Sequence, residues 1–314
     1  MRYYFAPMEG ITDSIYRRLH HEYFGGVDRY YMPFLSPTMH RQLTHKEERE
    51  LPMADSVSFT AVPQILTKNA EDFLWAAQVC ADRGYDEVNL NLGCPSGTVV
   101  SKGKGSGMLR DLDSLDAFLD EIYSKTPLPI SVKTRLGLEK PDEFPAILDI
   151  YNRYPMQELT IHPRTRKQFY DGKLHMDMFQ YAMENSKNPL CYNGDLTCKG
   201  DISAFAAQFP HIQAVMIGRG LIGNPGMLTE INVRRLEAFH NALLEEYIVA
   251  FGGGRNAMFR LKENWHMLIP HFEGSEKLWK RLRKTTDLAE FRSITTEIFH
   301  TLPWSALPDT GTAR

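Results

Sequence analysis

Residues 88–95 read VNLNLGCP, a strand pattern that ends in a turn. Apolar residues alternate with asparagines up to Leu92, which is the period of a β-strand with two different faces. Gly93 and Pro95 then stop the strand, so Cys94 is presented at the strand end rather than within an apolar face. A thiol there can reach a ligand, although an inert cysteine in a turn would have the same local sequence. The rest of the chain has to decide between these two interpretations.

Short apolar runs of this kind alternate with amphipathic segments along the chain. The predicted strands are Tyr3–Met8, Arg29–Met32, Val62–Leu66, Glu87–Leu92, Ile130–Thr134, Glu158–His162, Leu190–Asn193 and Ala214–Ile217. Helical patterns lie between most of them, for example at Ala70–Arg83, Ser114–Ser124 and Glu143–Tyr154. About eight strand–helix units over roughly 235 residues match the size and rhythm of a (β/α)8 barrel. A doubly wound open sheet is the alternative fold.

Polar side chains and glycines follow the predicted strands at their C-terminal ends, and their positions separate these two folds. They are Met8 and Glu9, Gln64, Cys94, Lys133 and Arg135, His162 and Arg164, Asn193–Asp195, and Gly218–Gly220. A barrel assembles its active site from the C-terminal ends of many strands, whereas an open sheet gathers such residues mainly at one switch point. The sequence therefore predicts an α/β fold with a (β/α)8 barrel.

The strand pattern stops after Asn224-Pro225, and the following chain is predicted to be helical. From Arg234 onward, one helix face carries the apolar residues Leu236, Phe239, Leu243 and Leu244. Further helices are expected at Ala257–Ile269, Glu276–Arg283 and Asp287–Phe299, with a glycine turn at residues 252–254 and a frayed tail after Pro303. We expect a barrel domain over residues 1–235 and a small all-helical domain over residues 236–314.

The composition is that of an ordinary globular protein, with 43% hydrophobic and 24% charged residues among 314. No apolar stretch has the length of a signal-peptide core or a transmembrane helix, so no membrane association is expected. The four cysteines, at positions 80, 94, 191 and 198, have neither metal-ligand spacing nor the pattern of a disulfide framework. We therefore expect reduced thiols, a cytoplasmic location and no metal site, and nothing in the sequence implies a protein partner.

The net charge of −3 hides a basic stretch between Arg255 and Lys284. This stretch holds eight lysines and arginines against three glutamates, a local charge of +5. Such a surface can neutralise nucleic-acid phosphates, although a solvated helix face would have the same charge. A second cluster, His162–Tyr170, combines a histidine, three cations and two aromatic residues, which can contact phosphates and stack on bases. This cluster indicates a nucleic-acid partner.

Three further features suggest chemistry at the barrel mouth. Lys133 alternates with Val132 and is expected to point into the mouth, where it would tune a flavin or make an internal salt bridge. Gly218–Gly220, which contains Arg219, resembles a barrel phosphate site, although glycine turns with an exposed arginine are common. The glycine-rich segment Ser96–Gly107 is expected to be a flexible loop, either one that orders over substrate or one that is merely mobile.

Taken together, these motifs resemble those of the tRNA-dihydrouridine synthases, flavin enzymes that reduce uridine in tRNA. The matching stretches, in the family's order, are residues 6–13 (APMEGITD), Gln64, 89–95 (NLNLGCP), 133–137 (KTRLG), 162–170 (HPRTRKQFY), 193–195 (NGD) and 216–220 (MIGRG). They span nearly the whole predicted barrel. Residues 7–10 and 95–99 lean toward the bacterial C-type branch. Thr98 stands where many members carry a lysine shortly after the Cys-Pro pair.

The resemblance implies FMN at the barrel mouth, reduced by NADPH or NADH. The residues that would bind FMN are Pro7, Met8, Glu9, Gln64, Lys133, His162, Asn193, Gly194, Asp195, Gly218 and Arg219. Hydride would pass from the reduced flavin to uracil C6, and Cys94 would protonate C5 as a general acid. Asn91 and Arg164 would contact the substrate. The expected substrate is folded tRNA with a base splayed into the mouth and its backbone gripped by the helical domain.

Two other functions are compatible with these residues. An FMN barrel that acts on a free pyrimidine, like the dihydroorotate dehydrogenases, would not require the basic helical tail. An RNA-binding protein that has lost catalysis would not require Cys94 and Lys133. Preference for free uridine over tRNA would favour the first of these, and failure to take up FMN would favour the second.

Overall fold

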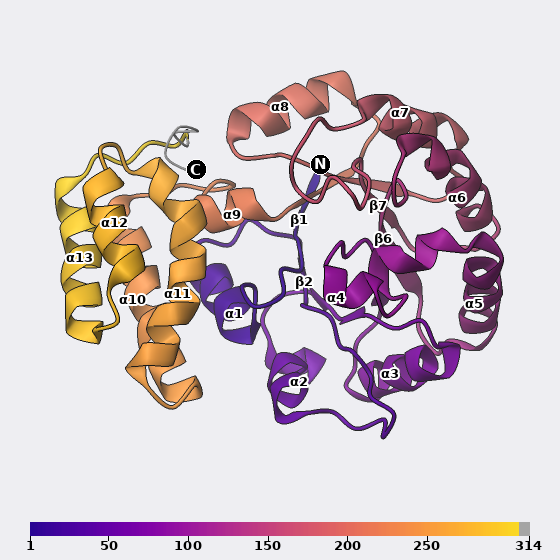
Figure 1. Cartoon of the computed structure of the whole chain (residues 1–314), viewed down its shortest axis with the longest axis horizontal. Helices are drawn as coiled ribbons and strands as arrows, with labels where there is room; N and C mark the ends of the chain where they lie inside the picture. Colours follow the sequence, from indigo (N-terminus) through magenta and orange to yellow (C-terminus); the bar gives the residue numbers. More distant parts are fainter. Residues whose placement is uncertain (308–314) are drawn as a thin grey trace. The chain divides into compact units, whose positions relative to one another are not determined.

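The computed structural model describes residues 1–307, in which short strands alternate with helices (Figure 1). The strands are β1 Arg2–Phe5, β2 Arg29–Tyr31, β3 Ala61–Val62, β4 Gln64–Ile65, β5 Val88–Leu92, β6 Ile130–Arg135, β7 Leu159–His162, β8 Leu190–Asn193 and β9 Ala214–Ile217. The α-helices are α1 Ser14–Tyr23, α2 His45–Glu50, α3 Ala70–Asp82, α4 Gly97–Val100, α5 Leu112–Lys125, α6 Phe144–Tyr151, α7 Met176–Asn185, α8 Lys199–Gln208, α9 Arg219–Gly223, α10 Val233–Ala250, α11 Gly254–Leu268, α12 Glu276–Lys284 and α13 Leu288–Thr301. Short 3-10 helices are η1 Ala54–Ser56, η2 Gly105–Arg110, η3 Pro141–Glu143 and η4 Ile269–His271.

The strands form one sheet in the order β3-β2-β1-β9-β8-β7-β6-β5-β4, and its pairings are parallel. The two end strands, β3 and β4, are neighbours in the chain and are separated only by Pro63. Proline has no amide hydrogen, so it interrupts the ladder at that point. Because β3 pairs with β2 and β4 pairs with β5, the sheet closes as an eight-stranded barrel with one split strand. The predicted (β/α)8 barrel is confirmed.

The barrel interior is filled by side chains from alternate strand positions. Tyr4, Tyr31 and Met216 belong to one fully buried cluster, with the smaller Cys191 and Ala214 beside them. Large and small side chains on neighbouring strands interdigitate in this way in a closed barrel. The barrel therefore has a packed core rather than an open channel.

Short polar side chains begin the long helices of the barrel. Asn69 accepts a hydrogen bond from the Asp72 amide at the start of α3 (2.9 Å), and Asp111 accepts one from the Ser114 amide at the start of α5 (3.2 Å). Such N-caps contribute about 1 kcal/mol each. These helices lie within a few residues of the segments predicted from the apolar spacing.

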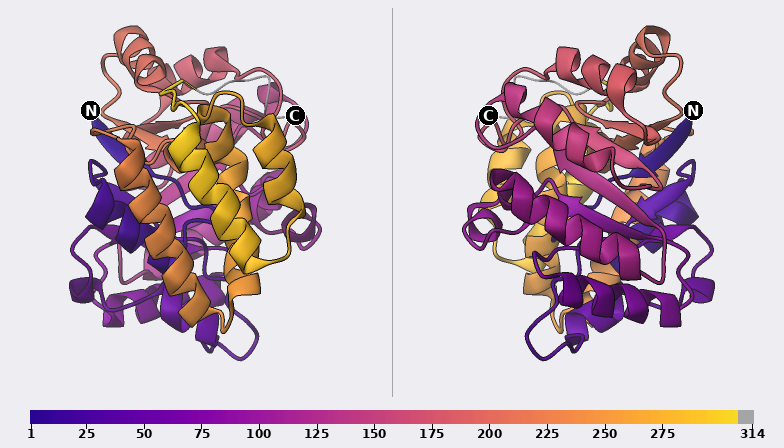
Figure 2. Two further views of the ribbon diagram at one scale, coloured as in Figure 1. Left: turned by 90° about the vertical axis from the view of Figure 1, so that its left-hand side faces the viewer. Right: turned by 90° about the vertical axis from the view of Figure 1, so that its right-hand side faces the viewer.

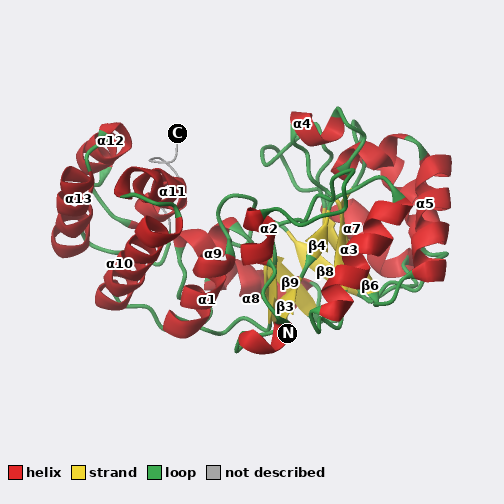
Figure 3. Ribbon diagram, turned by 90° about the horizontal axis from the view of Figure 1, so that it is seen from below, coloured by secondary structure: helices red, strands yellow, loops and turns green. Residues whose placement is uncertain are grey.

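The chain divides into two compact units. The first comprises residues 1–7, 29–194 and 210–216, which include nearly all of the strands, and Figure 3 shows α4 and its neighbouring loops beyond one end of these strands. The second comprises residues 8–28, 195–209 and the chain from Ile217 onward. In the second unit α10–α13 lie alongside one another (Figure 2), and the indole of Trp265 donates to His240 Nε2 at 3.0 Å. The predicted all-helical C-terminal region is confirmed, whereas its boundary at residues 235/236 stays a prediction.

Two segments are more ordered than the sequence suggested. The glycine-rich segment 96–107, predicted to be flexible, contains α4 and the start of η2. Its two chain reversals use the left-handed φ angles of Gly103 (68°) and Gly105 (58°). The predicted fraying after Pro303 is also wrong, because the Ser305 amide donates to the His271 carbonyl at 2.8 Å. The last part of that predicted tail, residues 308–314, lies outside the described residues.

Candidate functional site

A row of amide side chains lines the strands of the first unit where the predicted site begins. Gln64 donates to Asn89 Oδ1 and accepts from Asn91 Nδ2, both at 2.8 Å, and Asn89 donates to Ser131 Oγ at 2.9 Å. All four side chains are buried. In each amide, hydrogen bonds to neighbouring residues show which end is the oxygen and which is the nitrogen. The network therefore fixes the rotamers of these side chains. The structure thus brings two predicted site residues, Gln64 and Asn91, into direct contact.

Asn91 also shapes the turn that carries Cys94. Its Oδ1 accepts hydrogen bonds from the backbone amides of Gly93 (3.1 Å) and Cys94 (2.9 Å). An asparagine side chain that accepts amides two and three residues further on stabilises a tight turn. Gln64 accepts one of the two Nδ2 hydrogens, and the other has no acceptor within the described residues. Asn91 therefore connects the amide row with the cysteine.

The segment after α4 holds the same turn from a second direction. The Ser106 hydroxyl and amide both donate to the Cys94 carbonyl, at 2.8 and 3.2 Å. Gly105 lies so close that a Cβ on it would be 3.0 Å from the Cys94 Cβ. Cys94 itself is half-buried. A side chain fixed on both sides and still partly accessible has the geometry that a positioned acid requires.

Arg135 fastens the Cys94 turn to the loop that follows β7. Its Nε donates to the Gly93 carbonyl (2.9 Å) and its Nη1 to the carbonyls of Thr165 (3.1 Å) and Phe169. Its guanidinium carbon also lies 5.2 Å from the centroid of the Tyr170 ring. Burial lowers the pKa of Arg135 to about 10, so the side chain stays charged at neutral pH. Three carbonyl oxygens compensate this buried charge.

Lys133 lies in β6 opposite Asn91, in the same register as the amide row. It is half-buried, and no described residue makes a hydrogen bond or an ion pair with it. The internal salt bridge that was the alternative for this lysine is therefore absent from the described part of the chain. Burial and the neighbouring Arg135 guanidinium lower the pKa of Lys133 to about 7. An anionic ligand beside Lys133 would stabilise its charged form and raise its pKa again.

The predicted pair at the end of β7 is fixed by a hydrogen bond. His162 and Arg164 are both buried, and Arg164 Nη1 lies 3.2 Å from His162 Nε2. Arginine can only donate, so Nε2 accepts and the proton of the imidazole lies on Nδ1. Arg164 also donates twice to the Gly172 carbonyl, from Nη2 at 2.7 Å and from Nε at 3.2 Å. The structure therefore shows Arg164 orienting His162, and its predicted contact with the substrate stays a prediction.

The remaining predicted residues of the first unit are Pro7, Asn193 and Gly194. Asn193 donates from Nδ2 to the Met216 carbonyl at 2.8 Å, which ties the ends of β8 and β9 together. A Cβ on Gly194 would lie 2.1 Å from the Tyr192 hydroxyl. Packing alone therefore requires glycine at 194. Pro7 follows β1 and is half-buried.

Met8, Glu9, Asp195, Gly218 and Arg219 belong to the second unit. Asp195 and Arg219 form an ion pair at 2.9 Å, with both side chains more than one third exposed. An anion that binds Arg219 must compete with this carboxylate, although an exposed pair contributes at most about 1 kcal/mol. Gly218 is the residue before α9, and Met8 accepts backbone hydrogen bonds that form a turn with Ile11 and Thr12.

Part of the basic stretch in the second unit has an internal role. Arg260 donates to the Gly10 carbonyl, lies 3.9 Å from Asp13 and stacks 5.3 Å from the Phe251 ring centroid. Lys262 donates to the carbonyls of Arg283 and Thr285 at the end of α12. These two cations are therefore less available to a phosphate than the count of charges suggested. Lys277 and Lys280 have no ion pair within the described residues.

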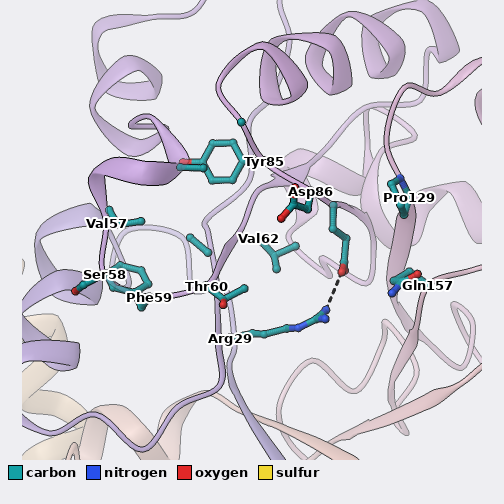
Figure 4. A pocket seen from close by; sticks show the side chains of 14 residues that line it. Arg29, Val57, Ser58, Phe59, Thr60, Val62, Tyr85, Asp86, Pro129 and Gln157 are labelled. Carbon is teal, nitrogen blue, oxygen red and sulfur yellow. Dashed lines mark hydrogen bonds and ion pairs between the residues drawn. The ribbon is translucent and has the colours of Figure 1, made fainter.

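A cavity of about 560 Å³ lies at the opposite, N-terminal ends of the strands (Figure 4). It is lined by Arg29 at the start of β2, Glu87 just before β5 and Gln157 just before β7, and Arg29 pairs with Glu87 at 2.7 Å. Next to this pair, Glu158 accepts from the Tyr4 hydroxyl at 3.1 Å, and burial raises the pKa of Glu158 to about 7. This end of a barrel serves stability, so we do not place the site here.

Residues 1–307 contain neither a candidate metal site nor a candidate membrane span. No group of three or more histidine, cysteine, aspartate and glutamate side chains there has the arrangement of a metal site. No helix in the same range is long and apolar enough to cross a membrane.

The fold and the polar strand ends define a (β/α)8 barrel with a candidate active site at the C-terminal ends of its strands. The solved structure of morphinone reductase shares this fold, with a TM-score of 0.52 over 74% of this chain and 87% of that chain at 12% identity. The family model described as dihydrouridine synthase (Dus) matches residues 4–300. The chain belongs to the dihydrouridine synthase family.

Relatives in two bacteria show how far the similarity extends. The chain is 31% identical to tRNA-dihydrouridine synthase B of Pasteurella multocida (strain Pm70) over 227 residues, which are 71% of this chain and 67% of the relative. It is 27% identical to a probable tRNA-dihydrouridine synthase of Rhizobium leguminosarum bv. phaseoli over 313 residues, which are 96% and 95% of the two chains. The family suggested by the sequence motifs is confirmed, whereas the C-type branch stays a prediction.

Three supporting residues were not identified from the sequence as part of the site. Gly105 and Ser106 contact Cys94, although they lie eleven and twelve residues after it in the chain. Ser131 is the last hydrogen-bond partner in the amide row. Arg135 was noted as a strand-end cation, but its role as a brace was not foreseen. This role depends on the burial of Arg135 among backbone carbonyls, and sequence spacing does not show burial.

Proposed function

We propose that the protein reduces uridine in tRNA to 5,6-dihydrouridine, with FMN at the barrel mouth and NADPH, or NADH, as the electron donor. The observation that carries this proposal is the Cys94 turn, which Asn91, Ser106 and Arg135 hold at the same strand ends as Lys133. Lys133 has no hydrogen bond or ion pair within residues 1–307. Membership of the dihydrouridine synthase family supports the same reaction. The related proteins named above carry tRNA in their names, which supports tRNA as the substrate here.

The residues of the mouth fit a flavin. Lys133 is half-buried and has no partner among the described residues, and a flavin presents negative charge around N1 and O2 when reduced. FMN would supply the hydride that reaches uracil C6. The residues proposed to hold it are Pro7, Met8, Glu9, Gln64, Lys133, His162, Asn193, Gly194, Asp195, Gly218 and Arg219.

Side chains of the protein would then supply the proton that completes the reduction of uracil. Cys94 would carry a proton and give it to uracil C5, which calls for a neutral thiol rather than a thiolate. The free Nδ2 hydrogen of Asn91 would hold a uracil carbonyl, and Arg164 would act near the base through His162. A base inside a helical stack cannot reach such a mouth, so the target uridine would be splayed out of a tRNA loop.

The loop after β7 supports an RNA substrate. Phe169 and Tyr170 are 41% and 51% exposed, and each lies under an arginine, at 5.4 Å from Arg166 and 5.2 Å from Arg135. Exposed aromatic rings beside cations suit bases and phosphates together. The basic stretch 255–284 would grip the tRNA backbone, residues 236–314 would form the tRNA-binding domain, and the C-type branch is the proposed subgroup. The free cysteines suit the cytoplasm, where tRNA is modified.

The experiment that tests the proposal is the Cys94→Ala variant. We expect it to bind FMN and to oxidise NADPH at the wild-type rate, while dihydrouridine formation on unmodified tRNA falls by about 10²-fold or more, the range for a lost general acid. The half-buried Cys198 is the matched control, and Cys198→Ser should keep full activity. Loss of flavin from Cys94→Ala would contradict the proton-donor role. A wild-type preference for free uridine over tRNA would contradict the substrate.

A further inference from the structure

Three lysines gather around Gly103, on the loop directly after the Cys94 turn. Lys102 and Lys104 flank this glycine in the chain, and a Cβ on Gly103 would lie 3.6 Å from Lys68 Nζ. Lys68 comes from the connection between β4 and α3, so two separate segments supply the cluster. We refer to Lys68, Lys102 and Lys104 as the lysine cluster. It lies in the first unit, on the side of the strands where Figure 3 shows α4.

No carboxylate within residues 1–307 forms a direct ion pair with the lysine cluster. Lys104 donates to Ser36 Oγ at 3.2 Å. Burial lowers the pKa of Lys104, the Asp72 carboxylate raises it, and Lys102 and Lys68 lower it further. Asp72 is itself engaged with Arg41 at 3.3 Å. Holding three like charges together costs free energy unless an anion joins them.

The lysine cluster is also directly connected to Cys94. Lys104 precedes Gly105, whose Cβ position would be 3.0 Å from the Cys94 Cβ, and the next residue, Ser106, donates to the Cys94 carbonyl. An anion on these ammonium groups would therefore bind the loop that packs against the proposed proton donor. Lysine is a point charge with three rotatable donors, which suits phosphate oxygens approached from several directions.

We propose that Lys68, Lys102 and Lys104 form a phosphate-binding site beside Cys94. The inference rests on the proposed function for its ligand, because that reaction brings two sources of phosphate to the mouth. One is the RNA backbone next to the target uridine, and the other is the phosphate groups of the nicotinamide dinucleotide. The chemistry of recognition is the same for both, and separate measurements distinguish them.

The test compares two triple variants. The first replaces Lys68, Lys102 and Lys104 by alanine. The control removes three exposed cations that precede β6, β7 and β8 at the other end of the barrel, Lys125, Arg153 and Lys187. A third protein with arginine in place of the three lysines should keep the charge and the affinity. The double variant Lys68→Ala/Lys102→Ala leaves the bond between Lys104 and Ser36 intact, and thermal unfolding checks that all variants are folded.

Binding of unmodified tRNA, followed by fluorescence anisotropy across salt concentrations, needs no turnover. If the lysine cluster binds the RNA backbone, each lost contact should weaken binding about 4- to 5-fold at 0.15 M salt and reduce the salt slope by about 1. The KM for tRNA should rise by the same factor, while kcat at saturation stays within about 2-fold. The control triple variant should show only the small loss of tRNA affinity that any removal of three positive charges causes.

Reduction of the bound flavin in the absence of tRNA gives the second measurement. If the lysine cluster binds the dinucleotide, the KM for NADPH should rise in the first triple variant and tRNA binding should be unchanged. The proposal is overturned if neither affinity differs from that of the control triple. If wild type makes no dihydrouridine yet one of these affinities depends on the lysines, the proposed reaction fails and the phosphate site stands.

Discussion

Replacing Asn91 by alanine tests the central geometric argument, that the amide row positions Cys94. The change removes three hydrogen bonds, from Gly93 N, from Cys94 N and to Gln64 Oε1. At about 1 kcal/mol net for each bond, the free energy of unfolding should fall by about 3 kcal/mol. A displacement of the thiol by about 1 Å would cost roughly 10²-fold in dihydrouridine formation. Reduction of the flavin by NADPH should change little, because that half-reaction does not involve the Cys94 proton.

Two further variants make the result specific. Asn89→Ala removes bonds to Gln64 and Ser131 from the same row but does not touch the turn, so it should lose stability and keep most activity. Asn91→Asp keeps an oxygen for both backbone amides and should retain more activity than the alanine variant. Unfolding would be followed with denaturant, and product by mass spectrometry of digested tRNA. The reasoning is refuted if Asn91→Ala makes dihydrouridine as fast as Asn89→Ala.

Other predictions concern stability and the ends of the barrel. The pKa of Glu158 is raised by burial from 4.5 to about 7, so the folded state binds the proton more tightly than the unfolded chain does. Stability should therefore be highest below pH 4.5 as far as this group is concerned. It should fall by up to about 3 kcal/mol as pH rises to 7, and Glu158→Gln should remove that slope in denaturant titrations. Gly194→Ala should destabilise the fold by about 1–3 kcal/mol, because its Cβ would meet the Tyr192 hydroxyl. A Tm equal to wild type would contradict that contact.

The strands were predictable because their two-residue period survives in each apolar run. The ends of the strands were less predictable where a proline or a turn interrupts the backbone hydrogen bonds despite the apolar pattern. The first strand was expected to run to Met8 but ends at Phe5, since Pro7 cannot donate and the Met8 carbonyl is used by a turn. The run Val62–Leu66 looks continuous in sequence, yet Pro63 divides it between two partners.

The candidate site was predictable only at the level of residue type. Polar residues at the strand ends had to meet at one end of a closed barrel, which pointed to Gln64, Cys94 and Lys133, whereas Asn91 was proposed from the family resemblance. The contacts between them depend on side-chain direction and loop path. The glycine-rich segment 96–107 illustrates this, because its composition indicates flexibility while its hydrogen bonds to the Cys94 carbonyl hold it in place. The lysine cluster joins residues 68 and 104, which no local pattern connects.

The split strand gives the barrel a weak joint. β2 and β3 share two residue pairs, and so do β4 and β5, whereas β5 and β6 share five. The bridge between Leu35 and Ile65 adds two backbone hydrogen bonds, at 2.7 and 2.8 Å, and the neighbouring β1–β2 pair is equally short with two residue pairs. Local opening has its lowest free energy where the ladders are shortest, so hydrogen exchange should begin among β1–β5. Such an opening would release Gln64 and with it the hydrogen bond to Asn91, the residue proposed to hold the uracil, while the β6–β7 pair that carries Lys133 and His162 stays closed. The position of Asn91 can then adapt to an incoming base while these two residues, both proposed to hold the flavin, stay in place.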